Sequence, residues 1–199
     1  WKPMEDKLLY ATVSKGFRPG GINRRAGVPE YGADFLENYE LGWKTTWNNT
    51  LRWNGAVYYQ EWKDFQFSFL GENSFTVIQN GPDARIYGLE TDITWTPTPG
   101  LTLTGSGAYT DAKTKQDLCL TAGQTVCAPG DLSAPRGTRL PITPKFKGNA
   151  SVRYEFEMAD VKPYVQAVVS HSSSAASDIR FDDGRGQNPR QQLGRLPSW

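Results

Sequence analysis

Residues 51–59 read Leu51-Arg52-Trp53-Asn54-Gly55-Ala56-Val57-Tyr58-Tyr59, and this stretch decides the fold. Successive side chains of a β-strand point to opposite faces, so the odd-numbered residues share one face and the even-numbered residues share the other. The odd-numbered set is mostly apolar, whereas the even-numbered set includes Arg52 and Asn54 and continues to Gln60. An apolar period of two residues indicates a strand rather than a helix.

The same alternation recurs along the chain. It is found from Tyr87 to Trp95, from Leu101 to Thr110 and from Phe146 to Phe156. We therefore expect an all-β protein with antiparallel strands. The periodicity predicts seven strands, at residues 7–18, 35–47, 51–70, 84–96, 101–112, 145–156 and 161–172.

Composition excludes several classes of protein. The chain has 199 residues and a net charge of +1, and 13% of its residues are aromatic, which is not the composition of a disordered chain. The balanced charge argues against a protein that binds nucleic acid through a basic charge over its whole surface. No run of 18 or more apolar residues is present, so no transmembrane helix is predicted. A mean hydropathy of −0.57 still permits a membrane barrel, because barrel strands alternate apolar and polar residues.

The connections between the predicted strands alternate strictly between short and long. In an up-and-down antiparallel sheet this order gathers all short turns at one end and all long loops at the other. Outer-membrane barrels have this asymmetry, with short periplasmic turns and long extracellular loops. We therefore predict periplasmic turns near 48–50, 97–100 and 157–160, and extracellular loops near 19–34, 71–83, 113–144 and 173–199.

The two faces of the predicted strands differ in chemistry. Aromatic residues gather toward both strand ends, as the interfacial girdles of a barrel require. The residues that we predict to face lipid are Leu41, Trp43, Trp53, Val57, Leu89, Ile93, Leu103 and Val152. The residues that we predict to face the lumen are Lys44, Glu90, Asp92 and Arg153. An apolar face can also form the core of a soluble β-sandwich, and that alternative stays open.

Five segments, in the right order, resemble one family. Residues 10–23, Tyr-Ala-Thr-Val-Ser-Lys-Gly-Phe-Arg-Pro-Gly-Gly-Ile-Asn, look like a strand and loop of TonB-dependent outer-membrane receptors. Residues 37–44, Glu-Asn-Tyr-Glu-Leu-Gly-Trp-Lys, look like another strand of those barrels. Residues 84–90, residues 99–112 and the Leu140-Pro141 return strand are similar to further parts of the same barrels. The resemblance covers nearly the whole chain.

The resemblance implies a transport receptor in the outer membrane of a Gram-negative bacterium. Such receptors are barrels of 22 strands that enclose an N-terminal plug and import scarce nutrients, ferric siderophores being the commonest. By this resemblance residues 1–199 form a fragment of the barrel, about seven strands without a plug domain. The implied partners are membrane lipid and lipopolysaccharide, a small ligand such as a ferric siderophore, and the TonB complex through a missing N-terminal region. No cofactor and no metal site are expected.

Some residues of the predicted loops suggest specific roles within such a receptor. Cys119 and Cys127 lie in the longest predicted loop, and an extracellular location would let them form a disulfide. Arginines suit the capture of an anionic ferric chelate, because their guanidinium groups match carboxylate and catecholate oxygens. The candidates for ligand binding are Arg18, Arg24, Arg25 and Arg85. The same cations can instead contact lipopolysaccharide phosphates.

Two alternatives to a transport receptor stay open. The first is a soluble all-β glycan-binding or adhesin domain. The second is an outer-membrane barrel enzyme in which His171 activates one of the serines that follow it. We expect no catalytic residues, because no Gly-x-Ser-x-Gly elbow supports a nucleophile, and because Glu90 and Asp92 are readily explained as lumen charges.

Overall fold

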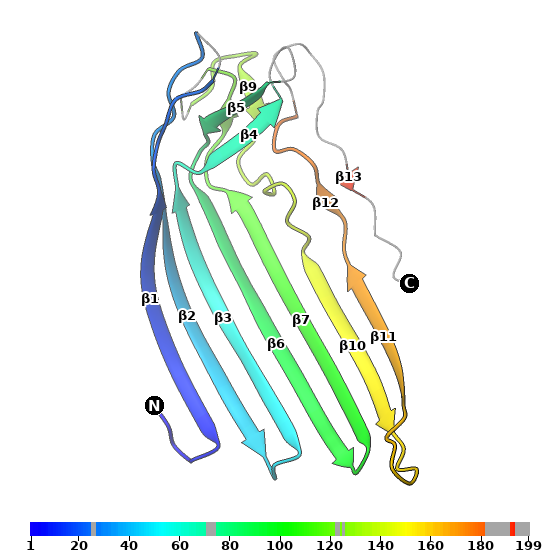
Figure 1. Ribbon diagram of the computed structural model, residues 1–199. Coiled ribbons are helices and arrows are strands. Elements are labelled where there is room, and N and C mark those ends of the chain that lie inside the picture. Colours follow the sequence, from blue (N-terminus) through cyan, green and yellow to red (C-terminus); the bar gives the residue numbers. More distant parts are fainter. Residues whose placement is uncertain (25–26, 71–74, 122–123, 125, 182–191, 194–199) are drawn as a thin grey trace.

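A computed structural model describes residues 1–24, 27–70, 75–121, 124, 126–181 and 192–193 of the chain (Figure 1). Its main element is one antiparallel seven-stranded sheet, in the order β1-β2-β3-β6-β7-β10-β11. Most neighbours in this sheet are also consecutive strands in the chain. The two exceptions are β3–β6 and β7–β10, which are separated in the chain by β4 and β5 and by β8 and β9, four short strands that pair outside the main sheet. The all-β antiparallel prediction is confirmed. The bounds are β1 Lys7–Arg18, β2 Asp34–Trp47, β3 Leu51–Lys63, β6 Ala84–Thr98, β7 Leu101–Thr114, β10 Phe146–Glu155 and β11 Tyr164–Ser172.

The predicted strand over residues 51–70 is wrong beyond Lys63. The chain leaves the sheet after Lys63, because Asp64 adopts a left-handed conformation with φ of 51°. The Asp64 amide donates a hydrogen bond to Asp83 Oδ1 (3.2 Å). The alternating residues that follow form β4 (Gln66–Leu70), which pairs with β5 (Thr76–Asn80) and not with the main sheet. The two-residue alternation therefore predicted that these residues form a strand, but it did not show that the strand pairs with β5.

The connections of the main sheet differ sharply between its two ends (Figure 1). Between β2 and β3, Asn48 and Asn49 have φ of 48° and 52°, and the Thr50 amide donates to the Trp47 carbonyl. Two successive positive φ angles are the requirement of a type I′ hairpin turn. Gly100, with φ of 79°, forms the turn between β6 and β7 at the same end. At the opposite end the connections are long. The connection between β3 and β6 contains β4 and β5, and the one between β7 and β10 contains β8 (Leu118–Cys119) and β9 (Leu132–Ala134). The segment after β11 contains β12 (Ala175–Ala176) and β13 (Gln192–Leu193).

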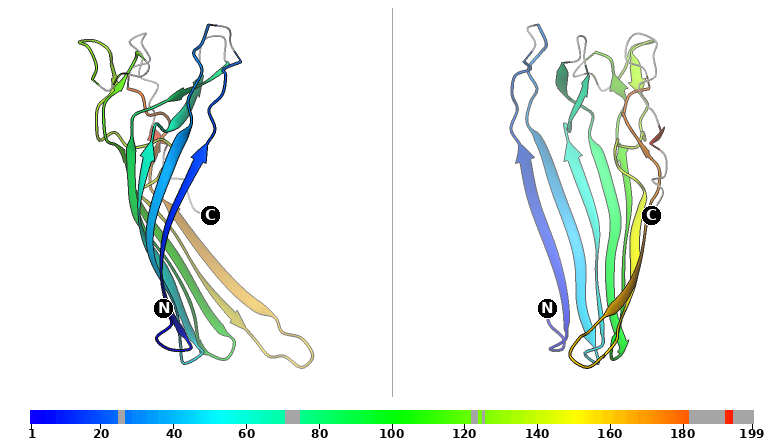
Figure 2. Two further views of the ribbon diagram at one scale, coloured as in Figure 1. Left: turned by 90° about the vertical axis from the view of Figure 1, so that its left-hand side faces the viewer. Right: turned by 45° about the vertical axis from the view of Figure 1, so that its right-hand side comes forward.

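The main sheet has an apolar face and a polar face. The register aligns Leu41, Val57 and Leu89 in one row across β2, β3 and β6. These side chains are 60%, 44% and 41% exposed, so no second layer of the described chain covers the apolar face. The next residues of each strand form the polar face, for example Asn54 beside Asp92. Figure 2 shows the sheet from two further sides as a single twisted layer, with β11 inclined to β1.

The buried hydrophobic residues gather at the end of the sheet with the long connections. Phe65 and Phe67 from β4 and its approach pack with Ala84, Ala112 and Ile179. Ala84 and Ala112 belong to the polar face, where Trp62 and Ile86 also lie. The long connections therefore fold across the polar face and create the only buried cluster found among the described residues. We call this end of the molecule the long-loop end.

Candidate functional site

Asp34 links four segments at the long-loop end. It is the first residue of β2 and is 1% exposed. Its carboxylate accepts hydrogen bonds from the Arg18 guanidinium, from Trp62 Nε1 (2.9 Å) and from the Gln66 amide (3.0 Å). A buried carboxylate is tolerated where charged and neutral donors replace its water. Asp34 thus attaches β4 to the ends of β1, β2 and β3.

Aromatic rings extend from this carboxylate along β4. Trp62 and Phe65 have ring centroids 5.7 Å apart, and the same spacing separates Phe65 from Phe67 and Phe67 from Phe69. Such tilted pairs add to the apolar burial of the rings. The Arg180 guanidinium lies 4.0 Å from the Phe69 ring. The sequence analysis predicted that these rings continue the strand that begins at Leu51. The Phe-x-Phe-x-Phe pattern at 65, 67 and 69 indicates a strand but does not show that the strand is a separate one.

A cavity of about 350 Å³ opens beside these rings. Its walls include Trp62, Phe65 and Phe67 on one side and Leu140, Ile142 and Asp178 on the other. Burial by itself raises the pKa of Asp178, but hydrogen bonds from the Arg180 side chain and amide outweigh it, so the pKa lies below the ordinary value. The cavity thus combines aromatic and aliphatic walls with the polar residues Gln66, Ser68, Thr143, Ser177 and Asp178, a mixed lining that suits a partly aromatic small molecule.

A second cavity of about 340 Å³ lies among three long connections. Its described lining includes the acidic residues Glu30, Asp64 and Asp117 and no lysine or arginine. Cys119 forms part of one wall. Sequence reasoning did not find this cavity, because its residues come from connections that are far apart along the chain.

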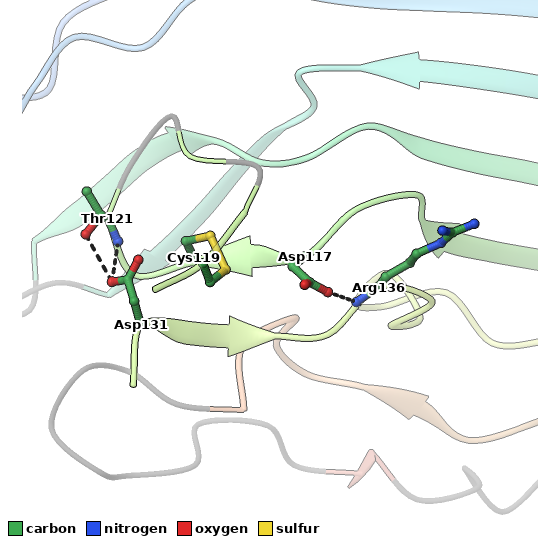
Figure 3. The surroundings of a disulfide bond; sticks show 6 residues. Asp117, Cys119, Thr121, Asp131 and Arg136 are labelled. Atoms are coloured by element: carbon green, nitrogen blue, oxygen red, sulfur yellow. Dashed lines mark hydrogen bonds between the residues drawn. A yellow bond between two sulfur atoms is a disulfide. The ribbon is translucent and has the colours of Figure 1, made fainter. Parts of the chain in front are cut away.

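Cys119 and Cys127 are joined by a disulfide with Cα atoms 5.2 Å apart (Figure 3). Hydrogen bonds hold the strands beside it. Asp131 Oδ1 accepts from the Thr121 amide (3.1 Å) and hydroxyl (3.0 Å). Asp117 Oδ1 accepts from the Arg136 amide (2.6 Å). The disulfide and these two carboxylates give the connection between β7 and β10 a defined shape at the second cavity.

The arginines predicted to bind ligand do not meet at one site. Arg18 pairs with Asp34 and also donates to the Gln66 carbonyl (3.0 Å), so its guanidinium is engaged in the fold. Arg85 lies in register with Glu61, on the same face as Leu89. Arg24 is exposed in the connection between β1 and β2. Arg25 lies outside the described residues. Neither cavity is lined by Arg18, Arg24 or Arg85.

The residues predicted to face the lumen lie on the polar face. Lys44, Glu90 and Asp92 line a broad hollow of about 880 Å³, in which Asn54 Nδ2 donates to Asp92 Oδ2 (3.0 Å). Arg153 lies near the short turns, where it pairs with Glu155 (2.8 Å). No group of three or more histidine, cysteine, aspartate or glutamate side chains with metal-binding geometry occurs in the described part of the chain.

The residues predicted to face lipid all lie on the apolar face. The list is Leu41, Trp43, Trp53, Val57, Leu89, Ile93, Leu103 and Val152. Trp43 is half-buried because its ring lies over Gly55, where a Cβ atom would come within 2.2 Å of it. This close approach requires glycine at position 55.

His171 lies on the apolar face, in register with Gly148 and 6.1 Å from the Phe146 ring. Ser170 and Ser172 are its sequence neighbours on β11 and so point to the opposite face. A nucleophile must lie within hydrogen-bond reach of its base. The alternation of the strand therefore separates His171 from these two serines.

Comparison with known proteins identifies the fold. Residues 1–199 match the family described as TonB dependent receptor-like, beta-barrel. The ferric yersiniabactin uptake receptor FyuA from Yersinia pestis superimposes on 98% of this chain with a TM-score of 0.72 at 20% identity. The FrpB iron transporter from Neisseria meningitidis (F3-3 variant) covers 98% with a TM-score of 0.64 at 16% identity.

The copper transporter OprC matches 96% of the chain, with a TM-score of 0.65 and 16% identity. The chain spans only 27% of FyuA, 29% of FrpB and 27% of OprC. Within the described residues, no helix is long and apolar enough to cross a membrane. The match over all 199 residues and the shared strand arrangement lead to one conclusion: the chain belongs to the β-barrel family of TonB-dependent receptors.

Proposed function

We propose that this chain is part of the barrel wall of an outer-membrane receptor that imports a small ligand with energy from the TonB complex. The observation that carries the proposal is the exposed apolar face of the main sheet. In β3 it extends from Leu51 to Tyr59 without a charged residue, and in β6 from Tyr87 to Trp95. Nine residues span about 26 Å at ~3.3 Å per residue, which fits a tilted membrane strand.

The orientation of the proposed barrel follows from its connections. The short turns near 48–50, 97–100 and 157–160 face the periplasm in this proposal. The long loops near 19–34, 71–83, 113–144 and 173–199 then face the cell exterior. Outer-membrane barrels have longer loops on the extracellular side. A membrane also explains why the apolar face has no covering layer, since lipid tails take the place of a second sheet.

The ligand proposed first is a ferric siderophore. Support comes from the names of two similar structures, a ferric yersiniabactin receptor and an iron transporter. The aromatic cavity beside Trp62 offers rings on which an aromatic chelating group can stack. Metal cargo other than iron fits the same fold, because the OprC structure is named as a copper transporter. In this proposal the long connections control access of the ligand to the barrel.

Uptake by cells tests the proposal. The complete receptor is expressed in a bacterium that lacks its own siderophore receptors, and uptake of radioactive iron is measured with a panel of catecholate, phenolate and hydroxamate siderophores. We expect uptake of at least one ferric siderophore that stops when TonB is deleted. A variant with Phe65→Ala and Phe67→Ala, compared with Phe156→Ala far from the cavity, should lose uptake. TonB-independent uptake, or none with any metal chelate, contradicts the proposal.

A further inference from the structure

Ile142 has a strained backbone conformation at the margin of the aromatic cavity. Its φ angle is 54°, in the left-handed region. The other non-glycine residues with positive φ in the described part of the chain are Asn48, Asn49, Asp64 and Ala159, so Ile142 is the only β-branched residue of this group. In the left-handed conformation a Cβ atom crowds the following carbonyl group, and a branched Cβ makes this conflict worse.

The surrounding chain holds this conformation in place. The Ile142 amide donates a hydrogen bond to the Ala176 carbonyl in β12 (2.7 Å). Leu140, two residues earlier, is 5% exposed and belongs to the buried cluster. Pro141 and Pro144 each restrict the residue before them to extended conformations. The bend at Ile142 is therefore fixed from both sides.

The side chain of Ile142 gains no burial from this arrangement. It is 73% exposed, whereas Ile179, another residue of the same cavity, is 1% exposed. Glycine or asparagine at position 142 would remove the steric conflict without loss of buried apolar area. Packing within the described chain thus does not account for this isoleucine. Strained residues cluster at active sites and ligand clamps, and a molecule in the cavity would cover the exposed side chain.

The lining of the aromatic cavity favours an uncharged aromatic group. Its described residues include no lysine or arginine, and Asp178 is the one charged residue among them. The arginines that adjoin this lining in the described chain are engaged in other contacts. Arg180 pairs with Asp178 (2.8 Å), Arg18 pairs with Asp34, and Arg139 donates to a backbone carbonyl after β11 (3.3 Å). The cavity thus offers rings, aliphatic groups and neutral polar groups to a ligand.

We propose that Ile142 contacts an uncharged aryl group of the ligand in the aromatic cavity and thereby determines which ligands bind. The inference rests on the proposed function of the chain in a siderophore receptor. The aryl group lies against the rings of Trp62, Phe65 and Phe67, and Ile142 closes the cavity from the other side. A branched apolar side chain makes this contact, whereas glycine or asparagine does not. A neutral chelate with an aryl group is therefore preferred over an anionic chelate and over one without a ring.

Three iron chelates separate the effect of the aryl group from that of charge. Ferric tris(benzohydroxamate) is neutral and carries phenyl rings, and ferric tris(acetohydroxamate) is neutral without rings. Ferric tris(catecholate) carries rings and a net negative charge. Each chelate is made with radioactive iron and an excess of free chelator. Equilibrium dialysis then measures its dissociation constant with the intact receptor in detergent micelles.

Three variants identify the role of the side chain. Ile142→Asn is the test variant, because asparagine tolerates the left-handed conformation but removes the apolar group. Ile142→Val keeps a branched apolar side chain at the same position. Val126→Asn is the matched control, because Val126 is 82% exposed in a long connection and lines neither of the two cavities at the long-loop end. The thermal unfolding midpoint of every variant is measured beside its binding.

We expect the neutral phenyl chelate to bind the wild type most tightly. Ile142→Asn should weaken that binding about tenfold, a typical consequence of lost apolar contact with a ligand. Ile142→Val and Val126→Asn should bind like the wild type. The unfolding midpoint of Ile142→Asn should be no lower than that of the wild type, because the substitution relieves strain. A purely structural role of Ile142 would instead lower the midpoint.

Unchanged binding in Ile142→Asn would overturn the inference, and so would weaker binding that comes with a lower unfolding midpoint. Tighter binding of the ringless or the anionic chelate to the wild type, or no binding of any of the three, would overturn it as well. TonB-dependent uptake of siderophores by cells is measured in parallel. Absence of uptake with every siderophore would contradict the proposed function instead.

Discussion

The apolar face of the main sheet and the cluster under the long connections use the same kinds of side chain in opposite ways. Leu41, Val57 and Ile93 leave large areas exposed on the sheet, whereas Phe65 and Ile179 are almost fully buried. The sheet is organised by backbone pairing between neighbouring strands, and no part of the described chain covers its apolar side chains, which in the proposed barrel would contact lipid. The long-loop end is organised like a small soluble core, with side-chain contacts between segments distant in sequence.

The largest expected effect comes from a charge placed in the middle of the apolar face. Val57→Arg should lower the free energy of unfolding of the intact receptor in lipid vesicles by about 2–4 kcal/mol, because the guanidinium would lie near the bilayer midplane. Guanidinium-induced unfolding from vesicles, followed by tryptophan fluorescence, measures the effect. Ala108→Arg on the polar face, beside Glu90 in the register, is the matched control and should have little effect. Equal losses in both variants would argue against a lipid-exposed face.

Removal of the disulfide should affect only the long-loop end. The variant Cys119→Ala/Cys127→Ala loses the loop-closure contribution of a short loop, about 2–3 kcal/mol in the chain-entropy treatment. We expect faster hydrogen exchange in residues 117–136 with unchanged exchange in β2 and β3. Reduction of the wild type with dithiothreitol should reproduce the result. Faster exchange throughout the main sheet would mean that sheet and loops unfold as one unit.

Asp34→Asn probes the link between the two regions. The substitution keeps the size of the side chain but removes the charge that binds Arg18, with an expected cost of about 1–3 kcal/mol for a buried charged hydrogen-bond acceptor. Limited proteolysis between β3 and β6 should accelerate, while insertion into vesicles should proceed normally. Glu37→Gln is the control, because it alters a surface ion pair whose net contribution solvent screening keeps small. Proteolysis no faster than in the control would contradict the linking role of Asp34.

The smallest effect concerns pH. Because the folded state lowers the pKa of Asp178 below the ordinary value of 3.8, its pair with Arg180 stabilises the folded loop above that pH. The stabilisation should disappear as the pH falls through the lowered folded-state pKa. Hydrogen exchange of residues 176–181, corrected for intrinsic rates, should show less protection at pH 3 than at pH 6. Asp178→Asn should remove this part of the pH dependence, and an unchanged dependence in the variant would assign it to other groups.

Much of the main sheet was predictable because each strand and each tight turn depends on residues that are close together in the sequence. Alternation from Leu51 to Tyr59 identifies β3 and its two faces without knowledge of any partner strand. Short connections then pair each strand with its neighbour, and the Asn48-Asn49 turn is compatible with only a few backbone conformations. The predicted strand 7–18 agrees with β1 residue for residue. Local pattern and hairpin geometry sufficed for these elements.

The candidate sites were not predictable in the same way. Phe65, Phe67 and Phe69 continue the alternation of β3. The chain nevertheless turns at Asp64, so these residues belong to the separate hairpin of β4 and β5. The arginine candidates were chosen by residue type, and their positions in space differ because Arg18 belongs to the polar face and Arg85 to the apolar face. A row of charged residues on the apolar face became visible only when five strands were placed in register; it consists of Lys15, Glu37, Glu61, Arg85 and Lys113.

The amino-acid sequence by itself determined which side chains share a face of each long strand and where the tight turns fall, because both depend on residues only a few positions apart. The tertiary structure alone decided that the long connections fold over the polar face, that Asp34 joins β4 to three other strands, and that charges line up across one border of the apolar face. Those features need contacts between residues up to about a hundred positions apart, such as Phe65 with Ile179 in one buried cluster, and no local period encodes such contacts.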